Sequence, residues 1–319
     1  MYFSYDSAIS FFNDELSHWT EVCQRYEALK GVNIRNMKIG DVRVGVQWNP
    51  ARIQSTGAKL DAATLKKRPC FLCGHNRPSQ QSFIPLDGGY EFLVNPFPIL
   101  PRHFTIPHSQ HRPQLIQDTY VDMMQIVAKM NNMLVFYNGP KSGASAPDHL
   151  HFQAGPIGIV PLQRDWDELY SPRLSRFFSD GNDISGLYAL NGYLCPGYVI
   201  ISRSAEESNV LFQKLYSAMP VQEADTEPQM NILSWTTNND EYITTIVLPR
   251  SKHRPECYFR EGDEQIMVSP GAIDMGGLLI TPREQDFRRL TPEIIEGIIK
   301  ECGCSESVIM QINDKIKSE

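Results

Sequence analysis

Residues 113–154 constrain the fold of this chain more than any other stretch. Helical spacing of apolar side chains runs through the first part, at Ile116, Tyr120, Met123, Val127, Met130 and Leu134. A strand-like segment, 134–137, follows, and residues 139–147 are rich in small side chains. Residues 149–154 alternate, which puts His149, His151 and Gln153 on one face of a strand. The stretch therefore predicts a helix and two strands around a polar face.

Other segments predict both strands and helices. Alternation predicts strands within 39–48, 90–94, 103–106, 232–236, 242–248 and 278–280. Helical spacing or a cap followed by proline predicts helices within 2–30, from Pro113 onward, at 206–219, from Thr291 onward and at 305–317. Residues 220–228 form an acidic linker bounded by prolines. We predict an α+β fold, an antiparallel sheet with helices packed on its faces.

Two short segments in the first half of the chain resemble segments in the second half. Residues 99–102 (ILPR) resemble 247–250 (VLPR), and 111–114 (HRPQ) resemble 253–256 (HRPE). Such short matches also arise by chance. Read as a duplication, they predict two related halves, residues 1–185 and 186–319.

Charge and composition exclude several classes of function. A formal net charge of -7 argues against a broad nucleic-acid or anionic-membrane surface. The first residues lack a basic segment followed by an apolar run, and no apolar stretch approaches membrane-spanning length. Seven scattered cysteines, an odd number, favour a reducing compartment over a disulfide framework. We therefore expect a cytoplasmic protein.

His151 and Gln153 suit chemistry at phosphorus. A neutral imidazole with a fixed tautomer can attack a phosphoryl group and form a covalent intermediate. The Gln153 amide can donate a hydrogen bond to a phosphoryl oxygen, but it cannot act as a general base. The pair therefore favours transfer to another phosphate over hydrolysis. Alternating histidines on a strand also serve as metal ligands or lie on a surface, and the pattern alone leaves these alternatives open.

Residues 148–153 (DHLHFQ), preceded by 136–139 (FYNG) and 142–145 (SGAS), resemble the His-x-His-x-Gln branch of the histidine-triad superfamily. This branch contains galactose-1-phosphate uridylyltransferases, dinucleoside tetraphosphate phosphorylases and GDP-hexose phosphorylases. The resemblance implies a histidine-triad-like fold, with His151 as the nucleophile and Gln153 as a contact to the nucleotidyl phosphate. It also implies substrate contacts from Asn138, Ser142 and Ser145. Pro147 and Asp148 stand before His149 where the uridylyltransferases have proline alone, which puts Ser145 in doubt.

Three further residues are predicted to bind substrate. Gly143 belongs to the loop of small residues, where the main chain can approach a phosphate. Asn95 opens the segment 95–104 (NPFPILPRHF), which resembles the tetraphosphate phosphorylases. Arg250 begins the basic run 250–254 (RSKHR), which can clamp phosphates or form a solvated charged loop.

The expected substrates are a nucleotide sugar or a dinucleotide together with a phosphate acceptor. The runs 149–153 (HLHFQ) and 66–69 (KKRP) resemble GDP-hexose phosphorylases and favour phosphorolysis, whereas the run 70–73 (CFLC) favours hexose-1-phosphate uridylyl transfer. Two alternative functions are a nucleotide-binding protein without catalytic activity and a hydrolase. A homodimer is compatible with the sequence.

Cys70 and Cys73 have the spacing of a zinc knuckle, although redox motifs and buried reduced cysteines share it. The resemblance to bacterial uridylyltransferases implies His108 and His149 as the remaining ligands, with His111 as a substitute for His108. Such a closed set of two cysteines and two histidines would hold a structural zinc ion.

Overall fold

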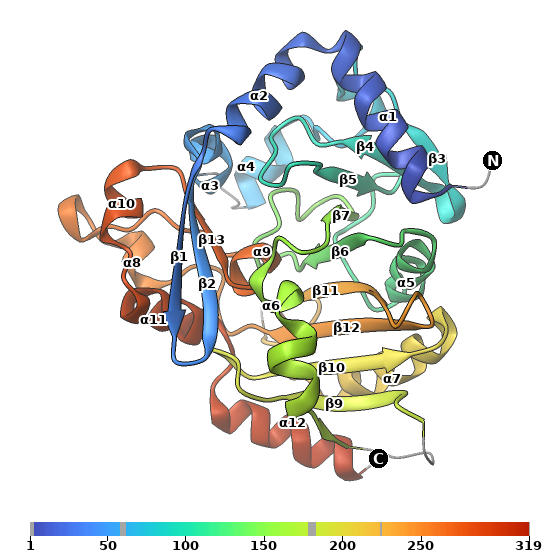
Figure 1. The fold of residues 1–319 in the computed structure, drawn as a ribbon, viewed down its shortest axis with the longest axis vertical. Coiled ribbons are helices and arrows are strands. Elements are labelled where there is room, and N and C mark those ends of the chain that lie inside the picture. Colours follow the sequence, from blue (N-terminus) through green and yellow to red (C-terminus); the bar gives the residue numbers. More distant parts are fainter. Residues whose placement is uncertain (1–2, 58–61, 178–182, 224, 319) are drawn as a thin grey trace.

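A computed structural model describes residues 3–57, 62–177, 183–223 and 225–318 (Figure 1). Its centre is a ten-stranded sheet in which every pair of neighbouring strands is antiparallel. The strands follow in the spatial order β3 (Ile84–Leu86), β4 (Tyr90–Val94), β5 (Phe104–Pro107), β7 (His151–Pro156), β6 (Met133–Asn138), β11 (Met230–Thr237), β12 (Tyr242–Pro249), β10 (Gly197–Ser202), β9 (Gly186–Leu190) and β8 (Ser175–Arg176). This confirms the predicted α+β class.

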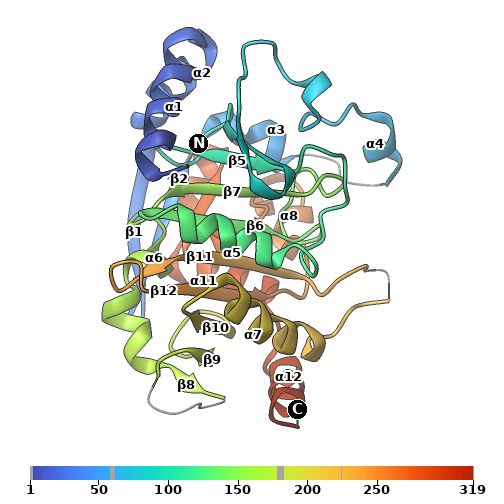
Figure 2. The same cartoon turned by 90° about the vertical axis from the view of Figure 1, so that its right-hand side faces the viewer.

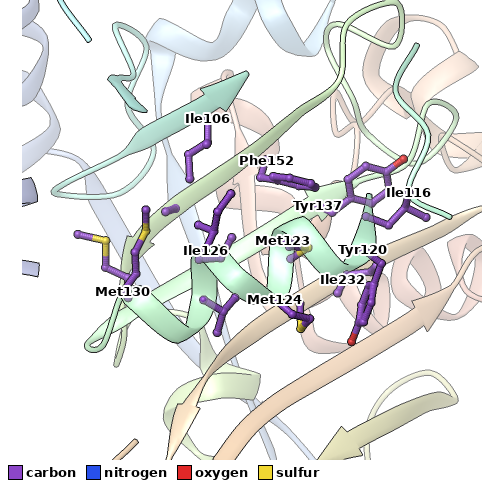
Figure 3. Packing of buried hydrophobic residues seen from close by; sticks show 14 of the residues in the cluster. Ile106, Ile116, Tyr120, Met123, Met124, Ile126, Met130, Tyr137, Phe152 and Ile232 are labelled. Atoms are coloured by element: carbon purple, nitrogen blue, oxygen red, sulfur yellow. The ribbon is translucent and has the colours of Figure 1, made fainter. Parts of the chain in front are cut away.

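One face of the sheet is covered by helices, as Figure 2 shows for α5 and α7. The helices whose residues join this core are α1 (Tyr5–His18), α2 (Thr20–Lys30), α5 (Tyr120–Lys129), α7 (Ala205–Ala218) and α12 (Glu306–Ser318). Met123, Met124 and Val127 of α5 are fully buried there. Figure 3 shows Met123 and Met124 packed among strand residues such as Phe152 and Ile232. The helical spacing seen in the sequence therefore marks the face of α5 that packs on the sheet.

The opposite face of the sheet carries a second core built around a small sheet. Its strands are β1 (Asn33–Ile39), β2 (Val42–Trp48) and β13 (Leu278–Thr281), with β13 parallel to β2. The accompanying helices are α6 (Pro161–Arg164), α9 (Ala272–Met275), α10 (Glu284–Arg289) and α11 (Pro292–Cys302). The remaining short helices are α3 (Ile53–Thr56), α4 (Ala62–Lys67) and α8 (Glu256–Phe259). In Figure 1 the β1–β2 hairpin stands upright beside the large sheet.

The order of elements repeats along the chain. The run β4, β5, α5, β6, β7 is arranged in the sheet as β4-β5-β7-β6. The run β9, β10, α7, β11, β12 is arranged in the same way, as β9-β10-β12-β11. Strands β6 and β11 pair directly, so the two runs share one sheet. This repetition supports a duplicated architecture, while the division at residue 185 stays a prediction.

Two of the predicted helices have different bounds from those expected. The segment 2–30 is divided at Trp19, whose backbone leaves the helical region with φ −110° and ψ 81°. The helix expected from Pro113 begins only at Tyr120. The Gln114 amide donates to the carbonyl of Pro147, and the Ile116 amide donates to the carboxylate of Glu227. These amides are bonded outside their own segment, and this arrangement replaces the first helical turns.

The helices in the described ranges are either too short or too polar to cross a lipid bilayer.

Candidate active site

The candidate site lies where strands β6 and β7 end their pairing. The last pair in this ladder is Phe136 with Gln153. Phe152 and Ala154 are buried in the helix-covered core, so alternation turns His151 and Gln153 to the other face of the sheet. Asn138 closes β6, two residues beyond Phe136, and therefore shares that face. The structure thus brings the predicted nucleophile, Gln153 and Asn138 together on neighbouring strands.

The ring of His151 has a defined tautomer. Its Nδ1 atom lies 2.8 Å from the carbonyl oxygen of His149. Because a carbonyl oxygen only accepts hydrogen bonds, Nδ1 carries the proton and Nε2 keeps a lone pair. The side chain is buried, and this burial lowers the pKa of His151 to about 4. At neutral pH the ring is therefore uncharged, with Nε2 available as a nucleophile.

The amide of Gln153 is oriented by His103. The Nε2 atom of His103 lies 2.9 Å from the Oε1 atom of Gln153. The amide of Ile99 donates to Nδ1 of the same ring over 3.4 Å, which leaves Nε2 as the protonated nitrogen. Burial, and after it the charge of Arg52, lowers the pKa of His103 to about 3. A neutral His103 thus occupies the oxygen of Gln153 and turns its NH₂ group away from the ring; a contact of this NH₂ group with a phosphate stays a prediction.

The loop after β6 is fixed against the second run of strands. Asn138 accepts hydrogen bonds at Oδ1 from the Asn231 side chain and from the amide of Ala272. Asn231 also donates to the carbonyl of Ser142. The hydroxyl of Ser142 is fully buried and has no hydrogen-bond partner within the described part of the chain. The Ser142 hydroxyl thus has an unused donor, while its predicted contact with a phosphate stays a prediction.

Gly143 has a steric role in this loop. Its φ is +96°, and a Cβ atom there would lie 2.5 Å from the Cα atom of Gly271. This position requires glycine because two backbone segments meet without room for a side chain. Its predicted role in substrate binding stays a prediction.

Two other predicted substrate contacts, Asn95 and Ser145, form hydrogen bonds within the protein. Asn95 donates through Nδ2 to the Thr105 hydroxyl and accepts from the amide of Phe97. Ser145 accepts from Arg68 through its carbonyl oxygen. The Arg68 guanidinium also pairs with Asp148, whereas the Lys66 side chain lies outside the described residues.

Arg250 does not have the free guanidinium that a phosphate clamp needs. The side chain is buried, and all five N–H groups donate to oxygen atoms of Cys302, Asn231, Pro270, Lys252 and His253. Since its donors are used, Arg250 orders the loops around the site through Asn231.

Sequence reasoning missed His103, Gln114, Asn231 and Arg52. His103, Gln114 and Asn231 are buried polar side chains that bond to the predicted site residues. Arg52 supplies positive charge beside His103. Asn231 carried one detectable signal, because it is polar within an apolar strand. His103 and Gln153 are separated by 50 positions in the sequence, and no local sequence pattern predicts their hydrogen bond.

Four side chains next to the site form a candidate metal centre. Donor atoms of Cys70, Cys73, His111 and His149 all lie within 4.8 Å of one another. Nδ1 of His149 is 3.2 Å from Sγ of Cys70 and 3.5 Å from Sγ of Cys73, and Nδ1 of His111 is 3.3 Å from Sγ of Cys73. Tetrahedral zinc with these ligands places its donors about 3.3–3.8 Å apart. The four residues therefore fit such an ion.

The second histidine of this group is His111, which corrects the expected His108. Nδ1 of His108 accepts from the amide of Gln110, and its ring packs edge-on against Tyr90. The carbonyl oxygen of His108 instead lies 2.7 Å from Nε2 of His149. Because a carbonyl oxygen only accepts, Nε2 of His149 carries the proton and donates, and Nδ1 keeps the lone pair that can bind a metal.

Residues 11–156 match a family model described as a domain of unknown function (DUF4922). No curated protein matches the chain. The crystal structure of yeast Ap4A phosphorylase Apa2 in complex with Ap4A is 17% identical and has a TM-score of 0.58, with 90% of this chain and 97% of that chain covered. The same enzyme in complex with AMP is 18% identical, with a TM-score of 0.57 and coverage of 91% and 96%.

An ADP-glucose phosphorylase from Arabidopsis thaliana with bound ADP-glucose matches at 14% identity and a TM-score of 0.33, covering 83% of this chain and 99% of that chain. At this TM-score the match adds nothing to the argument. The yeast enzyme, in contrast, covers 89% of this chain with a TM-score of 0.57. This chain therefore has the fold of yeast Ap4A phosphorylase over nearly its whole length, as its resemblance to the His-x-His-x-Gln branch predicted.

Proposed function

We propose that this protein transfers nucleotidyl groups through a covalent bond to His151. The observation that carries the proposal is the ring of His151, neutral, buried and held through Nδ1 so that Nε2 keeps its lone pair. The oriented amide of Gln153 and the unpartnered hydroxyl of Ser142 supply hydrogen-bond donors for phosphoryl oxygens.

The proposed reaction has two displacements. In the first, Nε2 of His151 forms a bond to the α-phosphorus, and the bond from that phosphorus to the leaving phosphate oxygen breaks. The ring then carries positive charge, which strengthens the hydrogen bond from Nδ1 to the His149 carbonyl. In the second, an oxygen of the acceptor phosphate attacks the same phosphorus and the P–N bond breaks. His151 returns to its neutral form, and no net proton transfer to the ring is needed.

The favoured reaction is phosphorolysis of a nucleoside diphosphate hexose or a dinucleoside polyphosphate. In the described part of the chain, no carboxylate is hydrogen-bonded to the His151 ring or to the Gln153 amide, which favours transfer to a phosphate over activation of water. The shared fold with an Ap4A phosphorylase is compatible with this choice. Transfer of UMP between hexose 1-phosphates is the alternative, because it uses the same two displacements.

We also propose that Cys70, Cys73, His111 and His149 hold a structural zinc ion. A bound ion would supply no acid or base, only a cross-link between the segment 70–73 and the residue that fixes the His151 tautomer. The residues themselves orient the nucleophile through the carbonyl of His149.

A labelling experiment tests the function. The protein is incubated with ADP-glucose, GDP-glucose, UDP-glucose and Ap4A, each labelled with ³²P at the α-phosphorus, and protein-bound label is measured. We expect label that is stable to alkali and labile to acid, as a phosphoramidate is. His151→Ala should remove the label and lower turnover by about 1,000-fold or more, while His18→Ala, at a half-exposed site on α1, should retain both.

Phosphorus NMR with and without inorganic phosphate then separates the alternatives. Nucleoside diphosphate formed only with phosphate indicates phosphorolysis, and exchange that requires a hexose 1-phosphate indicates nucleotidyl transfer between sugars. Release of free nucleotide without phosphate would indicate a hydrolase. Nucleotide binding without label or turnover would indicate a binding protein and would refute the proposal.

A further inference from the structure

The two strands that carry the site are separated by a side chain from elsewhere. Because Phe136 pairs with Gln153, the next pair in the same register would be Asn138 with His151. The ladder stops before that pair, and the side chain of Gln114 bridges the two residues instead. Nε2 of Gln114 donates to the carbonyl of Asn138 over 2.9 Å and to the carbonyl of His151 over 3.0 Å.

The same amide also binds the other backbone group of His151. Oε1 of Gln114 accepts from the His151 amide over 2.7 Å. Both main-chain groups of the nucleophile are therefore bonded to one side chain, as they would be to a neighbouring strand. The gap between Asn138 and His151 has the width of one inserted amide group.

Gln114 is itself held firmly. Its side chain is fully buried, and its backbone amide donates to the carbonyl of Pro147. Its carbonyl accepts from the Tyr137 hydroxyl over 3.2 Å. The loop before β7 and the strand β6 thus fix Gln114 from both sides, so its side chain can transmit their positions to His151.

We propose, on the basis of the nucleotidyl transfer above, that Gln114 is a positioning residue that sets the spacing between His151 and Asn138. Its amide holds the two strands apart by a fixed distance, so that the nucleophile and the loop after Asn138 can contact the same phosphate. Gln114 acts through these backbone groups and requires no contact with substrate.

Two substitutions separate the acceptor of Gln114 from its donors. Gln114→Met keeps the length of the side chain but removes all three hydrogen bonds. Gln114→Glu keeps an acceptor for the His151 amide and removes the donors to the two carbonyls. The matched controls are Gln163→Met and Gln163→Glu, because Gln163 is a buried glutamine that accepts from the backbone amide of Gly158 on another part of the fold.

The measurements are single-turnover labelling of His151, the Kd for AMP, the melting temperature and hydrogen exchange of the His151 amide. For Gln114→Met we expect labelling slowed at least about 30-fold, a Kd for AMP within about threefold of wild type, and amide exchange at least about tenfold faster. For Gln114→Glu we expect slow labelling with the amide still protected. The Gln163 variants should label at the wild-type rate.

Labelling of Gln114→Met at the wild-type rate would overturn the inference. So would a rate loss that Gln163→Met reproduces at the same melting temperature, since it would reflect stability alone. If the wild-type protein takes no label from any substrate, the proposed function fails on its own. The exchange experiment then decides the bridge separately, and an unchanged His151 amide in Gln114→Met would disprove it.

Discussion

His103 is buried under the candidate site, where its ring stacks with Phe136 and donates to Gln153. An imidazole in this position has two consequences. The His103 ring fixes the orientation of the Gln153 amide, whose NH₂ group faces away from it. Protonation of His103 is unfavourable because the charged ring would be desolvated. The same burial that prepares the site for phosphate therefore makes the folded state sensitive to acid.

Stability should fall below neutral pH because of His103. Its folded pKa of about 3 lies below the ordinary value of 6.5, so the unfolded chain binds the proton more tightly. The contribution of the neutral His103 ring to the free energy of unfolding is complete above pH 6.5 and is lost as the pH falls toward 3. Between pH 7 and 5.5 we expect wild type to lose about 1 kcal/mol more unfolding free energy than His103→Phe. Urea denaturation at both values measures this, and equal losses in the two proteins would contradict it.

Among the elements, the linker 220–228 is tied to the surroundings of the site through two carboxylates, Asp225 and Glu227. Lys141 of the loop after β6 pairs with Asp225, and Glu227 accepts from the Tyr137 hydroxyl and the Ile116 amide. Glu227 is buried, and this burial raises its pKa to about 7 in spite of the two hydrogen bonds. The linker therefore holds a carboxylate whose ionisation opposes folding.

Glu227→Gln should stabilise the protein at alkaline pH. The folded pKa is raised, so the contribution of Glu227 to stability is complete below about pH 4.5 and is lost as the pH rises through 7. At pH 8.5 we expect the variant to gain about 1–3 kcal/mol of unfolding free energy over wild type, and much less at pH 5.5. Thermal unfolding at the two pH values provides the comparison. A loss of stability at pH 8.5 would show that the ionised carboxylate is favourable.

At the element scale, prediction from the sequence succeeded where periodicity was local. Strands β4, β6, β11 and β12 and helices α7, α11 and α12 lie close to their expected positions because their apolar residues alternate or recur at helical spacing. Strands β9 and β10 were missed within a mixed segment. The late start of α5 depends on acceptors at Pro147 and Glu227, which are distant in sequence. Long-range partners of this kind leave no periodic signal.

Within the site, His151 and Gln153 were recognisable because their spacing matches a strand and a known motif. Gln114 and His103 form hydrogen bonds with site residues that are 37 and 50 positions away in the sequence. Their residue types alone therefore do not predict a place in the site. The choice between His108 and His111 was also undecidable from spacing, since the two histidines stand three positions apart in the same segment after the cysteine pair.

In the whole molecule, the candidate metal centre joins the connection that carries Cys70 and Cys73 to the segments beside the paired strands β5 and β7. Cys70 and Cys73 come from one connection, His111 from another, and His149 from the loop before β7. A metal bound only by the folded protein stabilises it by mass action.

We expect one zinc ion per chain and a lower melting temperature after treatment with a chelator. Where free zinc exceeds its Kd by about 1,000-fold, the loss is about 4 kcal/mol. His111→Ala should weaken zinc binding strongly, whereas His108→Ala should retain the ion because its contact to His149 is through the backbone. Metal content measured by mass spectrometry tests this pair. Loss of zinc from His108→Ala alone would reverse the assignment.

The contact between Gly143 and Gly271 has a consequence for how such chains can diverge. Gly143 lies in the loop between β6 and β7, and Gly271 directly precedes α9, beyond the second run of strands; a Cβ atom at residue 143 would lie 2.5 Å from the Cα atom of Gly271. A side chain at residue 143 is therefore permitted only after the opposing backbone has moved, whereas a Cβ atom at residue 271 would lie 2.9 Å from Oδ1 of Asn138. Both positions face the other segment, so changes in the loop after β6 and in the segment before α9 have to be accepted together.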